Sequence, residues 1–161
     1  MDAWSNFFVG ELGAAAAFAG LLFVSLSVNL TRILEIGRLA DRGLEAFIIL
    51  FLTVIVASLG LIPGQYLRVY GGEVFVAALL VLATLLRLQH SYLAQVDPKY
   101  VSAWRRTAGV NDAAVVTFVL AGLVVAVSGD PVGLNLLPVA VLLSFFAAGS
   151  NAWVLLIEIN R

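Results

Sequence analysis

The sequence predicts an all-α fold, a polytopic transmembrane bundle of five helices with its N-terminus outside and its C-terminus inside. Three observations support this. Hydrophobic residues make up 62% of the chain and charged residues only 12%, and the mean hydropathy is +1.05. Long apolar runs alternate with short charged or Gly/Pro-containing stretches, and no run shows the alternating pattern of a membrane barrel. So few charges cannot cover a soluble domain, and residues 1–161 are expected to form a single transmembrane domain.

Five apolar runs are long enough to be membrane spans, since about 20 helical residues cross a hydrocarbon core of about 30 Å. We expect spans at about 8–31, 44–62, 74–94, 113–128 and 136–157. The first ends at Arg32, the second before Pro63-Gly64, and the third before Asp97-Pro98.

The fourth run is the shortest of the five. It starts after Asn111-Asp112 and ends at 129–133, where two glycines and a proline predict a turn. Pro138 falls in the first turn of the fifth run, where its missing N–H costs little. Two full crossings are expected here, and a re-entrant pair of shorter helices is the alternative.

Lys and Arg predict the orientation, because basic side chains collect on the cytoplasmic side. They fall after the first, third and fifth runs, at Arg32, Arg38, Arg42, Lys99, Arg105, Arg106 and Arg161. The loops on the other side contain only Arg68. A chain with five spans places the N-terminus outside, whereas four spans would put Arg161 on the wrong side. We therefore expect a multi-pass membrane protein whose N-terminus lies outside and whose C-terminus lies inside.

Small residues recur at helical spacing in the first and last runs. They are Gly13, Ala17 and Gly20 in the first, and Ala140, Ser144, Ala148 and Ala152 in the last. Small side chains let helix backbones approach closely in a membrane. These faces pack either within one chain or between copies, and we predict a homo-oligomer.

Polar side chains at membrane depth gather toward the inner ends of the runs. The candidate intramembrane polar site consists of Ser25, Asn29, Thr84, Arg87, His90, Ser91, Asp112, Ser144 and Asn151. Such groups are costly in a bilayer and are expected to converge on one pocket. Four alternatives remain open. His90 could simply be solvated near the interface. Arg87 could extend to the interface or pair with a carboxylate. Asp112 could cap the fourth helix, and the asparagines could hydrogen-bond between helices. Glu45 is expected at the interface.

The motifs of catalysis and cofactor binding are absent from the sequence. With no cysteine and one histidine, the chain offers no thiolate chemistry and a poor metal site. It contains no phosphate-binding loop, HExxH or GxSxG pattern, and Gly71-Gly72 is expected to form a turn. We expect no catalytic, cofactor or metal site and no enzyme activity. The net charge of −1 gives no basic surface for nucleic acid.

Three stretches resemble a family of small bacterial membrane proteins of unassigned function. They are 7–30, Ile62-Pro63-Gly64-Gln65, and 151–156, which reads Asn-Ala-Trp-Val-Leu-Leu. Some members of that family are labelled as modulators of a membrane AAA protease. The resemblance implies a location in the bacterial cytoplasmic (inner) membrane.

Two functions are compatible with these features. The first is a homo-oligomeric ion channel or small-solute permeation protein, indicated by the small-residue faces and the polar belt around Asn29, Arg87 and Asn151. The second is a regulatory or assembly subunit that binds another membrane protein, for example a membrane protease. The expected partners are the lipid bilayer, further copies of the chain and, for the second function, that membrane protein.

Overall fold

The computed structural model describes residues 2–35, 38–95, 99 and 101–156, and these contain helices and no strands. The elements are η1 (Asp2–Trp4), α1 (Ser5–Val28), α2 (Leu30–Glu35), α3 (Leu39–Gly60), α4 (Leu67–Leu93), α5 (Val101–Ser128), η2 (Pro131–Asn135) and α6 (Leu136–Leu156). Five segments are long and apolar enough to cross a membrane: α1, α3, α4, α5 and the combined η2–α6 segment. The prediction of an all-α protein with five such helices is confirmed. Five apolar helices of this length are typical of a multi-pass membrane protein.

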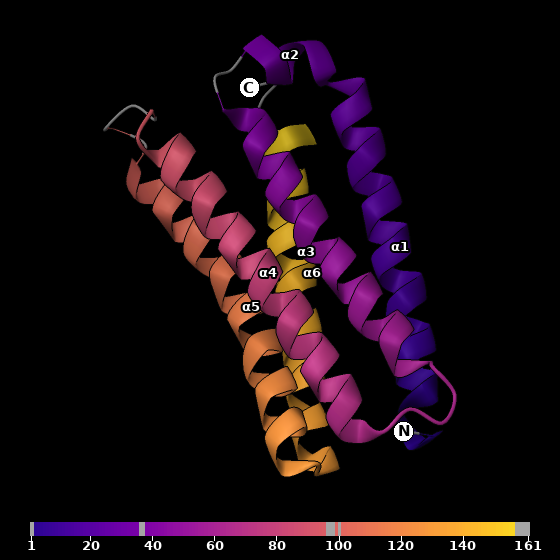
Figure 1. Cartoon of the computed structure of the whole chain (residues 1–161). Coiled ribbons are helices and arrows are strands. Elements are labelled where there is room, and N and C mark those ends of the chain that lie inside the picture. Colours follow the sequence, from indigo (N-terminus) through magenta and orange to yellow (C-terminus); the bar gives the residue numbers. More distant parts are fainter. Residues whose placement is uncertain (1, 36–37, 96–98, 100, 157–161) are drawn as a thin grey trace.

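The five long helices form one bundle with short connections. Figure 1 shows α4 and α5 as an antiparallel hairpin, with α1 beside α3 and α6 behind α3. The short helix α2 joins α1 to α3 at one end. At that end the α4–α5 hairpin diverges from α3 (Figure 1).

Four of the long helices begin before the predicted spans, and α4 and α5 do so by the largest margins. The fourth long helix, α5, starts at Val101 instead of 113, so it is 28 residues long and has the length to cross by itself. Arg105 and Arg106 interrupt the apolar run but not the helix. The third, α4, starts at Leu67 instead of 74. The prediction of a turn at Gly71-Gly72 is wrong, because both residues lie inside α4.

Glycines bring α4 and α5 into backbone contact. A Cβ atom added to Gly71 would lie 2.4 Å from the backbone nitrogen of Ala126 on α5. One added to Gly122 would lie 2.5 Å from the backbone nitrogen of Phe75 on α4. Neither site has room for a methyl group, so this tight pairing requires glycine on both helices.

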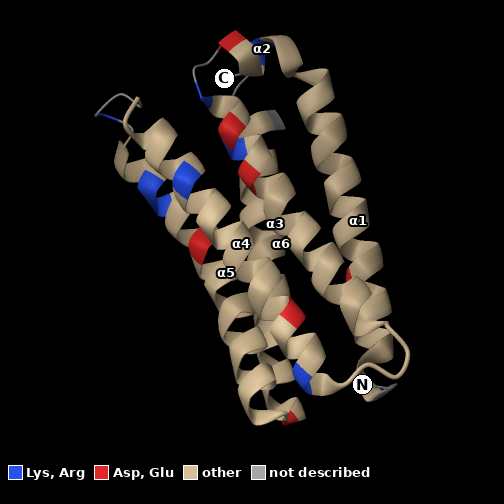
Figure 2. Cartoon of the chain, viewed as in Figure 1, with Lys and Arg blue, Asp and Glu red and all other residues tan. Residues whose placement is uncertain are grey.

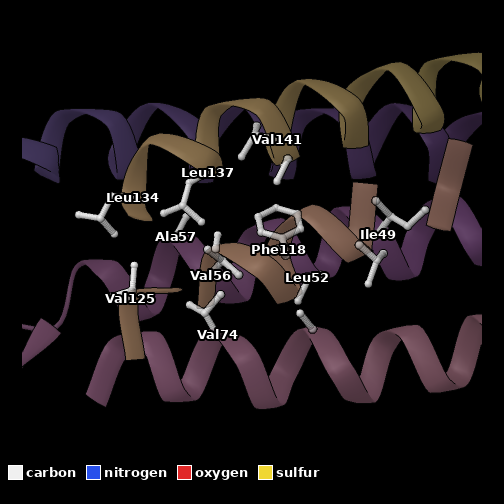
Figure 3. Packing of buried hydrophobic residues seen from close by; sticks show 14 of the residues in the cluster. Ile49, Leu52, Val56, Ala57, Val74, Phe118, Val125, Leu134, Leu137 and Val141 are labelled. Carbon is white, nitrogen blue, oxygen red and sulfur yellow. The ribbon is translucent and has the colours of Figure 1, made fainter. Parts of the chain in front are cut away.

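Apolar side chains fill the interior of the bundle. Figure 3 shows Phe118 of α5 close to Leu52 and Ile49 of α3, with Val141 of α6 on the other side. Phe118, Leu52 and Ile49 are fully buried. Packed side chains of α3 to α6 therefore occupy the middle of a single copy.

The two small-residue faces have different environments. On α6, Ala140, Ser144 and Ala148 are buried and Ala152 is half-buried, so this face packs inside the chain. On α1, Gly13, Ala17 and Gly20 are exposed. A Cβ atom added to Gly13 or Gly20 would meet no atom within 4 Å.

Basic residues concentrate at one end of the bundle (Figure 2). In the described part of the chain, every Lys and Arg other than Arg68 belongs to α2, the start of α3, the end of α4, the start of α5 or the α4–α5 connection. These segments lie together at the end near α2, which we call the basic end. Arg68 lies at the opposite end, at the start of α4 (Figure 2).

Candidate functional site

A polar cluster fills the bundle interior near the basic end, where α3, α4, α5 and α6 meet. We call it the Glu45 network, and it consists of Arg42, Glu45, Gln89, Tyr92, Thr107, Asn111, Asp112 and Asn151. Glu45, Asn111 and Asn151 are 0% exposed. Polar groups this deeply buried need hydrogen-bond partners from the protein itself.

Glu45 has neutral donors on both of its carboxylate oxygens. The Tyr92 hydroxyl donates to Oε1 at 3.0 Å, and Nδ2 of Asn111 donates to Oε2 at 2.6 Å. Helices α4 and α5 therefore both attach to α3 through this one carboxyl group. Hydrogen bonds to a carboxylate are stronger than those between neutral groups, which makes Glu45 the central acceptor of the network.

Asn151 extends the network to α6. Its Nδ2 donates to Oδ1 of Asn111 at 3.5 Å and to the carbonyl of Ala147, one turn earlier on α6, at 3.0 Å. The side-chain amides of Asn111 and Asn151 thus form a hydrogen-bonded chain that begins at Glu45 and ends at Oδ1 of Asn151.

Arg42 binds that oxygen and spans from α3 to both α5 and α6. Its Nε donates to Oδ1 of Asn151 at 3.2 Å, and its Nη2 donates to Oγ1 of Thr107 at 3.1 Å. The guanidinium also lies 5.4 Å from the ring centroid of Trp104, a cation–π distance. Trp104 in turn packs edge-on against Tyr92, with centroids 5.1 Å apart. The guanidinium of Arg42 is therefore connected to the carboxylate of Glu45 through two side-chain amides. These amides belong to Asn151 and Asn111.

Asp112 accepts a hydrogen bond from Nε2 of Gln89 at 2.9 Å. The alternative in which Asp112 caps the fourth helix is wrong, because α5 begins at Val101 and Asp112 lies well inside it. Its carboxylate instead connects α5 to α4 through this hydrogen bond, and Asp112 directly follows Asn111 in the sequence.

A groove of about 410 Å³ lies between α5 and α6 and reaches the network. Its lining residues are Arg42, Ala103, Arg106, Thr107, Val110, Asn111, Phe146, Ala147, Ser150 and Val154. Polar groups therefore occur toward the basic end of the groove, and apolar side chains form its walls.

Of the candidate polar residues, Asp112 and Asn151 belong to the Glu45 network. Asn29 lies apart from it and donates from Nδ2 to the Leu155 carbonyl at 3.1 Å, which ties the end of α1 to α6. Ser25 and Ser144 are buried and donate to carbonyls of their own helices, Leu21 at 2.7 Å and Ala140 at 2.8 Å.

The other four candidates share the outward face of α4. Thr84, Arg87, His90 and Ser91 are all exposed. The Thr84 hydroxyl donates to the Leu80 carbonyl at 2.8 Å, and Ser91 Oγ accepts from Nη2 of Arg38 at 2.9 Å. The structure does not bring Asn29, Arg87 and Asn151 together, because Gln89 and Tyr92 occupy the inward face of α4.

Sequence reasoning missed Arg42, Gln89, Tyr92, Trp104 and Thr107 as site residues and placed Glu45 at the interface. The available signal was spacing. Arg42 and Glu45 are three residues apart, as are Gln89 and Tyr92, so each pair lies on one helix face. Two such polar pairs near the same end of neighbouring helices indicate an internal polar contact.

No family model, curated protein or solved structure matches this chain significantly. Among the described residues, no three His, Asp or Glu side chains are grouped so that they could hold a metal ion. The geometry can fix four helices relative to one another and present a guanidinium to the groove.

Proposed function

We propose that the chain is a non-enzymatic protein of the bacterial cytoplasmic membrane that forms a homo-oligomer and permits an ion or small solute to pass between its copies. Its N-terminus would lie outside and its C-terminus inside. The concentration of basic residues at one end of the bundle supports this orientation (Figure 2), since such residues are retained on the cytoplasmic side.

The outward polar face of α4 is the observation that favours permeation. Thr84, Arg87 and His90 are exposed along about two turns of a helix whose neighbouring exposed residues, Leu80 and Leu86, are apolar. In a lone copy this face would meet lipid, which is unfavourable for polar and charged groups at membrane depth. Copies arranged with this face inward would surround a polar path.

The path must lie between copies because the interior of one copy is filled. Phe118, Leu52 and Ile49 leave the bundle centre packed with apolar side chains (Figure 3). Arg87 facing such a path would favour anions and repel cations. This distinguishes the proposal from an unselective leak.

Flux through liposomes containing the purified protein tests the proposal. We expect chloride flux above that of empty vesicles, a reduced flux for Arg87→Ala, and altered selectivity toward cations for Arg87→Glu. Arg105→Ala is the matched control, since Arg105 is an exposed arginine at the same end of the bundle but on α5. Wild-type protein that passes no ion above the empty-vesicle rate refutes the proposal.

A regulatory or assembly subunit is the second candidate, and α1 favours it. The exposed Gly13, Ala17 and Gly20 form a smooth face with no neighbour in the chain, suited to close approach by a helix of another membrane protein.

Cysteine crosslinking separates the two candidates, because the natural chain has no cysteine. Gly20→Cys carrying a thiol-attached photocrosslinker should crosslink to a second copy if α1 joins subunits, and to a different protein if the chain is a regulator. Leu142→Cys on α6, where Leu142 is 68% exposed, is the control for random collision.

A further inference from the structure

The groove between α5 and α6 combines a basic end with apolar walls. Arg42 and Arg106 supply two guanidinium groups, and Thr107 and Ser150 supply hydroxyls. Among the described residues that line the groove, none carries a carboxylate. The nearby acids are engaged elsewhere, since Glu45 accepts from Tyr92 and Asn111 and Asp112 accepts from Gln89.

Arg42 is held in position before any ligand arrives. Its contacts with Asn151 and Thr107 use Nε and Nη2, and Trp104 lies against the guanidinium. Within the described part of the chain, Nη1 makes no hydrogen bond. A fixed guanidinium with free donors is well suited to a phosphate oxygen, because less side-chain entropy is lost on binding.

The groove walls suit an acyl chain. Val110 of α5 and Phe146 and Ala147 of α6 line it, and Phe146 is 65% exposed, so the wall is open at the surface of the bundle. Phe146 lies ten positions before Leu156, the last residue of α6, so about 15 Å of helix separates it from the end of α6 that lies at the basic end. The polar part lies near the basic end, where the headgroups of one leaflet would be.

We propose that this groove binds one anionic phospholipid, with the phosphate near Arg42 and Arg106 and an acyl chain along Val110, Phe146 and Ala147. Basic pockets between membrane helices on the cytoplasmic side are suited to such headgroups. The charge of the lining residues selects an anionic over a zwitterionic headgroup. The site belongs to a single copy, so it does not depend on the proposed permeation path.

The test uses native mass spectrometry of the full chain, released from phosphatidylcholine nanodiscs that contain a minor fraction of phosphatidylglycerol. We expect one retained phosphatidylglycerol and little retained phosphatidylcholine. Arg106→Gln should lower the retained phosphatidylglycerol about fivefold, the effect of one basic residue at an anionic surface. Arg105→Gln is the matched control, because Arg105 is the adjacent exposed arginine and does not line the groove.

A second variant blocks the groove without changing charge. Ser150→Phe should displace the lipid while circular dichroism shows unchanged helix content, since Ser150 is exposed at the groove rim. Equal retention of both lipids by the wild type, equal losses in Arg105→Gln and Arg106→Gln, or full retention by a folded Ser150→Phe would each overturn the proposal. Displacement of the lipid by inorganic phosphate alone would also overturn it, because the site would then bind free phosphate.

Discussion

Nδ2 of Asn111 on α5 lies 2.6 Å from Oε2 of Glu45 on α3, and both residues are fully buried. This bond joins two helices that are far apart in the sequence, at the depth where the bundle changes from a basic end to an apolar core. The carboxyl group of Glu45 depends on Asn111 and Tyr92 for its hydrogen-bond donors.

Replacing Asn111 should destabilise the bundle strongly. Asn111→Leu leaves one buried oxygen of Glu45 without a donor, and we expect a loss of about 1–3 kcal/mol of unfolding free energy. Unfolding by sodium dodecyl sulfate in mixed micelles measures it. Asn135→Leu, at an exposed asparagine in η2, should change stability by less than about 0.5 kcal/mol. Equal effects of the two substitutions would contradict the role given to Asn111.

Glu45 and Asn111 should also show coupling. The double variant Glu45→Leu/Asn111→Leu removes both partners, so it should lose less stability than the sum of the single variants, by about 0.5–3 kcal/mol. The same unfolding measurement on all four proteins gives this coupling. Additive losses would mean that the bond contributes nothing beyond side-chain packing.

Removing the Tyr92 hydroxyl should cost less than removing Asn111. Tyr92→Phe keeps the ring that packs on Trp104 but leaves Oε1 of Glu45 without this donor. We expect a loss of about 1–2 kcal/mol by the same unfolding method. Tyr66→Phe is the control, because Tyr66 is 80% exposed and its hydroxyl should contribute little. A Tyr92→Phe protein as stable as the control would show that the contact is dispensable.

Adjacent glycines of α4 should respond in opposite ways to the same substitution. A methyl group at Gly71 collides with the α5 backbone, so Gly71→Ala should lose about 1–3 kcal/mol or fail to assemble. A Cβ atom at Gly72 meets nothing within 4 Å, and Gly72→Ala should gain up to about 1 kcal/mol from helix propensity. Thermal unfolding in detergent compares the pair. If both variants behave alike, α4 and α5 do not pack as described.

The proposed orientation can be checked by thiol labelling, since the natural chain has no cysteine. Ser5 and Ser102 are exposed at the starts of α1 and α5, near opposite ends of the bundle (Figure 1). In intact cells, a membrane-impermeant maleimide should label Ser5→Cys but not Ser102→Cys. In permeabilised cells, the maleimide should label both variants. Labelling of both positions in intact cells would refute an orientation with the N-terminus outside and five crossings.

Hydropathy predicted the helical class because long apolar runs have few structural solutions in a membrane. It could not predict where α5 begins. Arg105, Arg106 and Asp112 lower the local hydropathy, although α5 continues through all three. Likewise, Gly71 is a turn signal in isolation but a packing residue next to Gly122. At Gly71 the partner helix, rather than local composition, explains why glycine is needed.

The candidate site was predicted only in part for a related reason. Helical spacing predicts that Thr84, Arg87, His90 and Ser91 share one face of α4, and the structure leaves all four exposed, but spacing alone does not say which face points inward. Tyr92 and Gln89 occupy the inward face of α4. They donate hydrogen bonds to the carboxylates of Glu45 on α3 and Asp112 on α5. Pairings between residues as distant in sequence as Glu45 and Asn111 require the tertiary arrangement.

The glycine contact between Gly71 and the α5 backbone has a mechanical consequence. Because the two backbones touch, neither helix can slide or bend there without steric overlap, so the α4–α5 hairpin is expected to move as one rigid body. Any displacement of that body relative to α3 and α6 must then break polar contacts that cross between the two halves. Near the basic end these include the bonds from Tyr92 and Asn111 to Glu45 and the bond from Arg42 to Thr107, so buried hydrogen bonds limit how far the halves of the molecule can separate.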